Sequence, residues 1–267
     1  MGERLSIVRQ VPQHVFDWWS EFAGSTAVLA GTYPKATITG VLRPSTLAQA
    51  PDAAAAPAAP PAWRRWLGLG ASGARAIAQA AVPAAQAQLV WANMSLHWAQ
   101  DAPALMREWQ RALAVDGFLM FSTLGPGTLM ALREVYRTHG WGTPYAPWTD
   151  MHDLGDMLVE AGFADPVMDQ ETLRLTWSSA QAAVAELRTL GANTDGARFA
   201  GLRTPRWRER LLQALGARVD AQGRVLLEFE VVYGHAFKPV PRARLAAHTE
   251  VGLDDMKAML NRGRPGP

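Results

Sequence analysis

The sequence predicts a doubly wound α/β domain, with helices on both faces of a sheet of about seven strands, the last one or two of them antiparallel. Two observations predict this fold. Short buried-strand runs alternate with helical patterns through much of the chain, and the last third holds two long segments of alternating apolar and polar residues, as in antiparallel strands. Hydrophobic residues make up 49% of the 267 residues, which is enough for a core of this size.

The first elements lie in VFDWWSEFAGSTAVLAGTYPKATITGV, residues 15–41, which has the outline of a strand, a tight loop, a helix and a second strand. The first strand ends near Asp17, and the loop after it reads DWWSEFAG. Nucleotide-binding chains place glycines in such a loop, because the backbone can then approach the ligand. Here Trp19 and Glu21 lie in the loop, so its position is that of a cofactor loop but its residue types are not.

The elements after residue 87 follow in regular order. They are a buried strand at 88–93, a helix with one apolar face at 102–114, a turn at Asp116 and Gly117, a buried strand at 118–123, a helix after the Gly-Pro-Gly turn at 125–127, and a helix from Thr149 or Asp150 to Gly162. In the last third, strands at 169–177 and 224–238 enclose helices at 178–190 and 205–215. The right-handed crossover rule then fixes most of the topology.

We expect a single domain over residues 1–240, interrupted by an alanine- and proline-rich flexible segment at 47–62, and a frayed tail at 241–267. Gly68, Gly70 and Gly73 match the phosphate-binding pattern G-x-G-x-x-G. That pattern indicates a phosphate site only after a buried strand, and the preceding residues APPAWRRW are not one. We therefore interpret these glycines as part of a connector.

Charge and composition exclude several function classes. The net charge is +2, the chain has no cysteine, and its six histidines show no metal-ligand spacing. The N-terminus has no secretory apolar core, and no window is long enough for a membrane span. We expect a cytoplasmic protein with no metal, no membrane partner and no nucleic-acid partner. The arginine clusters at 203–210 and 242–264 are explained as well by a solvated helix face and a loose tail as by nucleic-acid binding.

Several stretches resemble one enzyme family. VFDWW and YPKATITGV, then LVWANMSLHW, RALAVDGFLMFSTLGPGTLMALREVY and ELRTLGAN, are similar to class I S-adenosylmethionine-dependent methyltransferases. More narrowly, they resemble the malonyl-acyl-carrier-protein O-methyltransferases of biotin synthesis. The resemblance extends from about Ala87 to Lys238 and is weaker before that. It implies a Rossmann-like methyltransferase fold, S-adenosylmethionine as cofactor, and a malonyl thioester or its acyl-carrier protein as partner.

The resemblance places the cofactor-binding positions at Asp17, Trp19, Gly24, Leu42 and Asn93. The glycines of the family's first loop fall at Trp19, Glu21 and Ala23, and the acid that holds the ribose hydroxyls falls at Leu42.

The third acidic position, which contacts the adenine amine, falls within ARAIAQAAVP, where only Gln79 is an uncharged polar residue. An indole therefore stands where the family's backbone approaches the cofactor, and a charge-assisted acceptor worth roughly 1.5–3 kcal/mol is missing at the ribose.

A malonyl carboxylate is already ionised at neutral pH, so its methylation needs no general base but does need cations or donors that aim it. We take Arg133, Tyr233 and His235 as the candidate catalytic residues, with Lys238 as a further cation. Each also has a purely structural explanation, either as a solvated helix residue or as an edge-strand residue with satisfied hydrogen bonds.

Two hypotheses remain open. The first is an O-methyltransferase of the biotin-synthesis type, acting on a malonyl thioester, with the arginine-rich helix at 204–210 as the docking face for an acidic carrier. The second is an inactive pseudo-methyltransferase that binds a partner protein, which Trp19, Glu21 and Leu42 favour. A nucleic-acid methyltransferase is disfavoured, because its acceptor-site signature and a basic stripe are both missing from the sequence.

Overall fold

The computed structural model describes residues 1–21, 24–44, 75–191 and 193–241. The alanine- and proline-rich segment, the glycine pattern at 68–73 and the tail beyond residue 241 lie outside the described residues. Within these ranges, no helix is long and apolar enough to cross a membrane.

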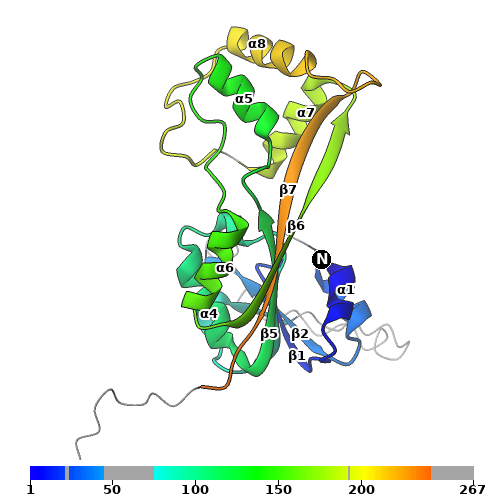
Figure 1. Cartoon of the computed structure of the whole chain (residues 1–267), viewed down its shortest axis with the longest axis vertical. Helices are drawn as coiled ribbons and strands as arrows, with labels where there is room; N and C mark the ends of the chain where they lie inside the picture. The colour runs from blue at the N-terminus through cyan, green and yellow to red at the C-terminus, as the bar shows by residue number, and fades with distance from the viewer. Residues whose placement is uncertain (22–23, 45–74, 192, 242–267) are drawn as a thin grey trace, which may run out of the picture.

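In the described residues, seven strands form one mixed sheet in the order β3-β2-β1-β4-β5-β7-β6, which confirms the predicted fold (Figure 1). Strands β1 to β5 are parallel, and β7 pairs antiparallel with both β5 and β6. The strands are β1 (His14–Trp18), β2 (Thr37–Leu42), β3 (Arg75–Ala78), β4 (Ala87–Ala92), β5 (Leu113–Leu124), β6 (Ala164–Trp177) and β7 (Val225–Phe237).

The sheet order reverses between β1 and β4, because β2 and β3 lie on one side of β1 and β5 lies beyond β4. At such a topological switch point, open α/β sheets bind ligands outside the carboxyl ends of their strands. The loops after β1 and β4 are therefore where a ligand site is expected.

Helices cover both faces of the sheet, with α4 and α6 on one face and α1 on the other (Figure 1). The helices and single 3-10 turns of this body are η1 (Gly2–Ile7), α1 (Thr26–Thr32), η2 (Gln79–Ala81), η3 (Leu96–Trp98), α4 (Ala102–Ala112) and α6 (Met151–Glu160). Helix α4 begins where Asp101 accepts a hydrogen bond from the backbone N–H of Ala104, and α6 begins at Asp150 in a similar way.

The body has two cores. On the α4 and α6 face, Trp18 of β1 meets Trp109 of α4 edge to face, with ring centroids 6.4 Å apart. Trp109 in turn packs against Phe121 of β5. On the opposite face, Val15, Leu29 and Phe118 pack beneath η1 and α1.

A second region, which we call the cap, is built on the free ends of β6 and β7. These two strands continue to pair beyond Leu124, the last residue of β5. They carry α5 (Met130–Thr138), α7 (Ala180–Leu187), η4 (Arg188–Leu190) and α8 (Pro205–Gly216), as Figure 1 shows. The cap has its own apolar core, in which Trp177, Leu215 and Phe229 are buried.

Two local expectations differ from the structure. The expected turn at Asp116 and Gly117 is an irregularity inside the continuous strand β5, because Asp116 adopts a left-handed conformation (φ 62°) while its backbone N–H donates to the carbonyl of Lys238. Strand β6 begins at Ala164 rather than Asp169, because it pairs along nearly all of β7.

Candidate functional site

The candidate site lies along the carboxyl ends of the parallel strands. Strands β1, β2 and β3 end at Trp18, Leu42 and Ala78, and we call this stretch the β1–β3 edge. Strands β4 and β5 end at Ala92 and Leu124, and we call this stretch the β4–β5 edge. The two edges meet at the switch point and differ in what fills them.

At the β1–β3 edge, the side chain of Trp19 fills the space above the strand ends. Its backbone N–H donates to the carbonyl of Val41 on β2 over 2.8 Å. Its indole Nε1 donates to Oε1 of Gln79, the first residue after β3, over 2.9 Å. Only 6% of Trp19 is exposed, so the indole is part of the core of the body.

Polar contacts hold this arrangement from two sides. The amide Nε2 of Gln79 donates to Glu108 of α4 over 2.7 Å, which fixes the acceptor that faces the indole. The guanidinium carbon of Arg43 lies 5.8 Å from the centroid of the Trp19 ring. Glu21 accepts from the backbone N–H of Arg43 and also forms an ion pair with its guanidinium.

Asp17 lies beside this edge, with its side chain directed toward α1. It is 1% exposed, its Oδ2 accepts from the hydroxyl of Thr26 over 3.4 Å, and its Oδ1 is buried without a partner among the described residues. Burial raises the pKa of this carboxyl from 3.8 to about 7, and the negative charge of Glu21 adds to the rise. Gly24, which the sequence also predicts as a site residue, has a left-handed backbone (φ 56°) and is exposed.

At the β4–β5 edge, Asn93 follows β4 directly. Its Oδ1 accepts from the hydroxyl of Ser122 on β5 over 2.7 Å, and the oxygen of Ser122 accepts from the backbone N–H of Met94 over 3.0 Å. These bonds tie the loop after β4 to β5 and fix the Asn93 side chain.

A cavity of about 100 Å³ lies just beyond these residues, lined among others by His97, Thr123 and Trp148. The Nδ1 of His97 lies 3.4 Å from the hydroxyl of Thr123. Burial lowers the pKa of His97 from 6.5 to about 4, so its ring is neutral at physiological pH. The Thr123–His97 pair therefore presents one hydrogen-bond donor to the cavity, either the hydroxyl or the Nε2–H, and His97 contributes no charge.

Aromatic rings connect this cavity to the cap. Trp148 is stacked on Tyr145 with ring centroids 4.2 Å apart, and the guanidinium carbon of Arg133 on α5 lies 5.3 Å from the centroid of the Tyr145 ring. Tyr145 donates its hydroxyl hydrogen to the backbone carbonyl of Thr128 over 2.8 Å. Arg133 thus lies two rings away from the cavity.

A second connection explains the LRTLGAN stretch. Gly191 has φ 131°, and a Cβ placed on it would lie 2.6 Å from Cη2 of Trp98, so only glycine fits against this ring. Asn193 donates from its side chain to the carbonyl of Thr143 over 2.8 Å. These contacts hold the loop after η4 against η3, beside the cavity.

The remaining predicted catalytic residues do not gather at this site. Tyr233 pairs with Ser122 across β5 and β7, but its hydroxyl donates to Glu171 on the edge strand β6, while Arg4 covers its ring. Burial and this carboxylate raise the pKa of Tyr233 to about 12.

His235 lies one step further from the carboxyl ends, opposite Met120, and its pKa is lowered by burial. Lys238 donates to the carbonyl of Leu113, at the amino end of β5. The expectation that Lys238 is a site cation is therefore wrong, because strand β7 runs antiparallel and carries it to the opposite edge.

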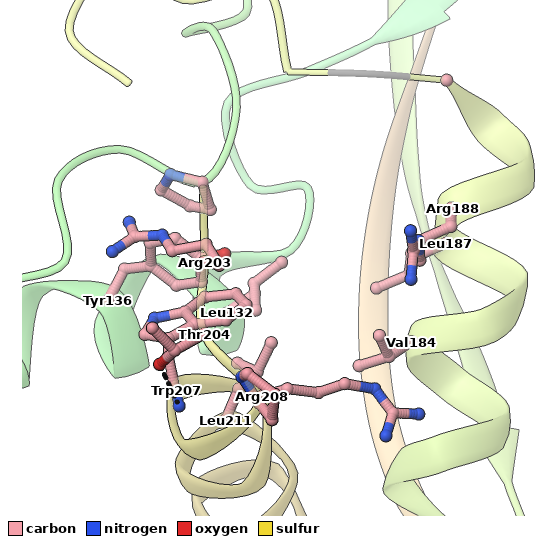
Figure 2. Close-up of a pocket in the computed structure, with 13 residues that line it drawn as sticks. Leu132, Tyr136, Val184, Leu187, Arg188, Arg203, Thr204, Trp207, Arg208 and Leu211 are labelled. Carbon is pink, nitrogen blue, oxygen red and sulfur yellow. Dashed lines mark hydrogen bonds between the residues drawn. The ribbon is translucent and has the colours of Figure 1, made fainter. Parts of the chain in front are cut away.

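A larger groove of about 730 Å³ lies in the cap, between α5, α7 and α8 (Figure 2). Leu132, Val184 and Leu211 give it an apolar lining, and Arg188 and Arg208 lie at its rim. Sequence reasoning missed this groove and missed Tyr145 and Trp148, which lie in a long irregular segment with no periodic pattern. Within the described ranges, no three His, Asp or Glu side chains gather as a metal site.

No protein-family model matches the chain, but curated proteins are similar to it over most of its length. It is 36% identical over 248 residues to a malonyl-acyl-carrier-protein O-methyltransferase of Laribacter hongkongensis. The aligned region covers 91% of this chain and 82% of the relative. It is 35% identical over 256 residues to the protein of the same name from Nitrosospira multiformis, with coverages of 92% and 82%.

Solved structures share the fold at low identity. The YcgJ protein of Bacillus subtilis superposes with a TM-score of 0.57 at 12% identity, over 90% of this chain and 98% of that one. A putative methyltransferase, BH2331 of Bacillus halodurans, gives 0.55 at 15% identity, over 89% and 98%. These likenesses concern the architecture alone.

Proposed function

The chain belongs to the malonyl-acyl-carrier-protein O-methyltransferase family, and we propose that it methylates the free carboxylate of a malonyl thioester carried by an acyl-carrier protein. The methyl donor in this proposal is S-adenosylmethionine, as the family resemblance implies. The observation that carries the proposal is the 36% identity over 82% of the length of a curated relative. S-adenosylmethionine supplies an electrophilic methyl group when it is bound.

We assign the malonyl carboxylate to the cavity at the β4–β5 edge. Its volume of about 100 Å³ equals that of roughly three water molecules, which suits a three-carbon acid better than a long chain. Thr123 and neutral His97 are bonded to each other, so the pair leaves one donor, either the Thr123 hydroxyl or the Nε2–H of His97, to orient the carboxylate. Because the acceptor is already an anion, no residue has to remove a proton from it, and the site contributes by position and by excluding water.

The β1–β3 edge does not fit the adenosyl half of the donor in the arrangement described. Leu42 offers no acceptor for ribose hydroxyls, the acceptor of Gln79 is used by Trp19, and the Glu21 carboxylate is used by Arg43. Asp17 is different, because its unpartnered buried oxygen can accept from a ligand N–H donor. The adenosyl half is therefore where this chain departs from its family.

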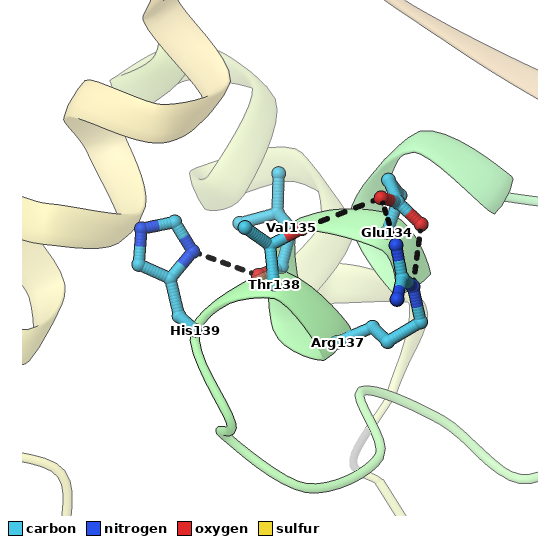
Figure 3. Close-up of polar contacts among 5 residues, drawn as sticks. All are labelled: Glu134, Val135, Arg137, Thr138 and His139. Carbon is cyan, nitrogen blue, oxygen red and sulfur yellow. Dashed lines mark hydrogen bonds and ion pairs between the residues drawn. The ribbon is translucent and has the colours of Figure 1, made fainter.

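We assign the carrier protein to the groove of the cap. Arg188 and Arg208 are exposed at its rim, and in the described part of the chain neither forms an ion pair, so they can attract an acidic carrier (Figure 2). Arg137 on the same cap is different, because its guanidinium donates twice to Glu134, over 2.9 and 2.7 Å (Figure 3). The apolar lining of the groove, between Arg188 and Arg208, suits the flexible arm that carries the acyl group in an acyl-carrier protein.

The test is transfer of a labelled methyl group from S-adenosylmethionine to a malonyl-loaded acyl-carrier protein. We expect Thr123→Val to lower kcat/KM at least tenfold, because a donor to the carboxylate is lost. We expect the double variant Arg188→Glu and Arg208→Glu to raise the KM for the carrier at least fivefold. The matched controls are Thr172→Val on β6 and Arg218→Glu beyond α8, both exposed and outside the two cavities.

Neither control should change the kinetic constants by more than twofold. Transfer that is unaffected by Thr123→Val would place the acceptor elsewhere. An equal rise in KM with Arg218→Glu would reduce the groove to a general charge effect.

A further inference from the structure

We infer, taking the donor from the proposed function, that the indole of Trp19 occupies the place that the adenosyl group needs. The donor then binds only after this side chain has left the β1–β3 edge. Trp19 is in this sense an internal occupant of the cofactor site, held there by Gln79 and Arg43.

The position of the ring carries the first step. Ligands of open parallel sheets lie across the carboxyl ends beside the switch point, which here lies between β1 and β4. Trp19 follows β1 directly, is bonded to Val41 of β2 by its backbone, and reaches Gln79 after β3 with its ring. The indole thus crosses three strand ends, and at 6% exposure it leaves little room above them.

The hydrogen bond of the ring carries the second step. Gln79 is held by its donation to Glu108, so its Oε1 points at the strand ends as a fixed acceptor. Trp19 offers this acceptor a planar ring with an N–H at its edge, and an adenine base offers a planar ring with an amine at its edge. Indole and adenine would therefore approach the same oxygen, and because the indole already lies there, the two rings compete for the same space.

The backbone of the loop carries the third step. Trp19 has φ 53°, a left-handed conformation that glycine adopts freely and tryptophan adopts rarely. At Trp19 the backbone thus has a conformation typical of glycine while it carries an indole. A glycine at this position needs no new loop path, so Trp19→Gly should empty the site without rebuilding it.

The outer side of the ring is covered as well. Arg43 lies over the Trp19 ring, and Glu21 holds Arg43 through its backbone N–H and its guanidinium. An aliphatic residue, Leu42, precedes Arg43 at the position where the family's ribose-binding acid falls. The described edge is thus complementary to its own tryptophan rather than to a nucleoside.

The experiment is calorimetric titration of the full chain with S-adenosylhomocysteine, comparing the natural protein with Trp19→Gly. We expect at least a tenfold lower Kd for Trp19→Gly. The matched control is Asp116→Gly, which relieves a similar left-handed residue (φ 62°) at the opposite edge of the sheet and should leave the Kd unchanged. A natural protein that binds at micromolar concentration, with no gain in Trp19→Gly, would overturn the inference.

Free indole gives a second readout. If the ring of Trp19 fills the adenosyl place, added indole should bind Trp19→Gly, raise its Tm, and weaken S-adenosylhomocysteine binding by competition. Simultaneous binding of both molecules without competition would contradict the inference. Should Trp19→Gly fail to fold, Trp19→Phe, which lacks the ring N–H and is smaller, is expected to show an intermediate gain of at least threefold, and no gain would count against the inference.

The two proposals fail separately. Trp19→Gly that binds S-adenosylhomocysteine tightly but transfers no methyl group to the malonyl carrier supports the internal occupant and contradicts the proposed reaction. Efficient methyl transfer by the natural protein, together with micromolar cofactor affinity, supports the proposed reaction and contradicts the inference about Trp19.

Discussion

At the β4–β5 edge the chain leaves a cavity of about 100 Å³ beside His97 and Thr123, whereas at the β1–β3 edge the space above the strands holds the indole of Trp19. Both edges belong to one sheet. In the proposed assignment they are the acceptor and donor sides of a two-substrate site, and their different contents then imply that the two sides can change independently. The cap contacts the β4–β5 edge. The residues that differ from the family's cofactor-binding pattern, Trp19, Glu21 and Leu42, lie at the β1–β3 edge.

The largest effect on stability is expected at the β1–β3 edge. Asp17→Asn removes a buried carboxyl whose pKa is raised from 3.8 in the unfolded chain to about 7 in the folded protein. Because the folded pKa is the higher one, the carboxyl's stabilising contribution is complete below pH 4 and is lost as the pH rises through 7. A difference of this size corresponds to roughly 4 kcal/mol.

The measurement is urea unfolding at pH 5 and pH 8. We expect Asp17→Asn to gain stability relative to the natural protein on going from pH 5 to pH 8. Asp156→Asn, an exposed position on α6, should show no such pH-dependent gain. Equal pH dependence in both variants would mean that Asp17 is solvated in the folded chain.

An intermediate effect on stability is expected beside the β4–β5 edge. Gly191→Ala places a Cβ 2.6 Å from Cη2 of Trp98 and forces alanine to φ 131°. We expect a loss of roughly 2–3 kcal/mol of unfolding free energy, from backbone strain and a displaced ring. Gly196→Ala is the matched control, since nothing lies within 4 Å of its Cβ position.

Thermal unfolding of both glycine variants gives the answer directly. A Tm for Gly191→Ala equal to that of Gly196→Ala would show that Trp98 does not hold the loop. A drop in Tm for Gly191→Ala alone, together with a higher KM for the methyl acceptor, would show that the contact between Trp98 and Gly191 shapes the β4–β5 edge.

The smallest effect on stability is expected at the hydrogen bond between Trp19 and Gln79. Gln79→Leu removes the acceptor of the Trp19 ring and should cost roughly 1–2 kcal/mol, because the indole N–H is then buried without a partner. Gln181→Leu, exposed on α7, is the control and should be neutral within about 0.5 kcal/mol. Chemical denaturation measures both, and a neutral Gln79→Leu would show that the ring is held by packing alone.

Much of the fold could be predicted from the sequence, because it depends on local patterns. Buried apolar runs predicted the strands at 88–93 and 118–123, an apolar face predicted the helix at 102–114, and Asp150 marked the start of the next one. The replaced glycine at Trp19 was visible as well, through the family resemblance, because comparing residue types along a loop needs no tertiary information.

The arrangement of the site could not be predicted in the same way. The bond from Trp19 to Gln79 joins residues 60 positions apart, across a segment without a pattern. The displacement of His235 and Lys238 from the site follows from the register of β7, which depends on its pairing with β5 and β6 rather than on its own alternation. Tyr145 and Trp148 gave no signal, because irregular segments are ordered by contacts that only the folded chain makes.

The unbroken course of β6 and β7 from the body into the cap has a mechanical consequence. A loop at this junction would act as a hinge, but two hydrogen-bonded strands resist sliding and bend mainly by changing their twist. Any displacement of the groove relative to the cavity is therefore a torsion of this ribbon, which stores elastic energy and restores the starting position. The contact of Trp98 with Gly191 adds a second connection between body and cap, so we expect the distance between the proposed carrier-binding rim and the proposed acceptor cavity to stay fixed.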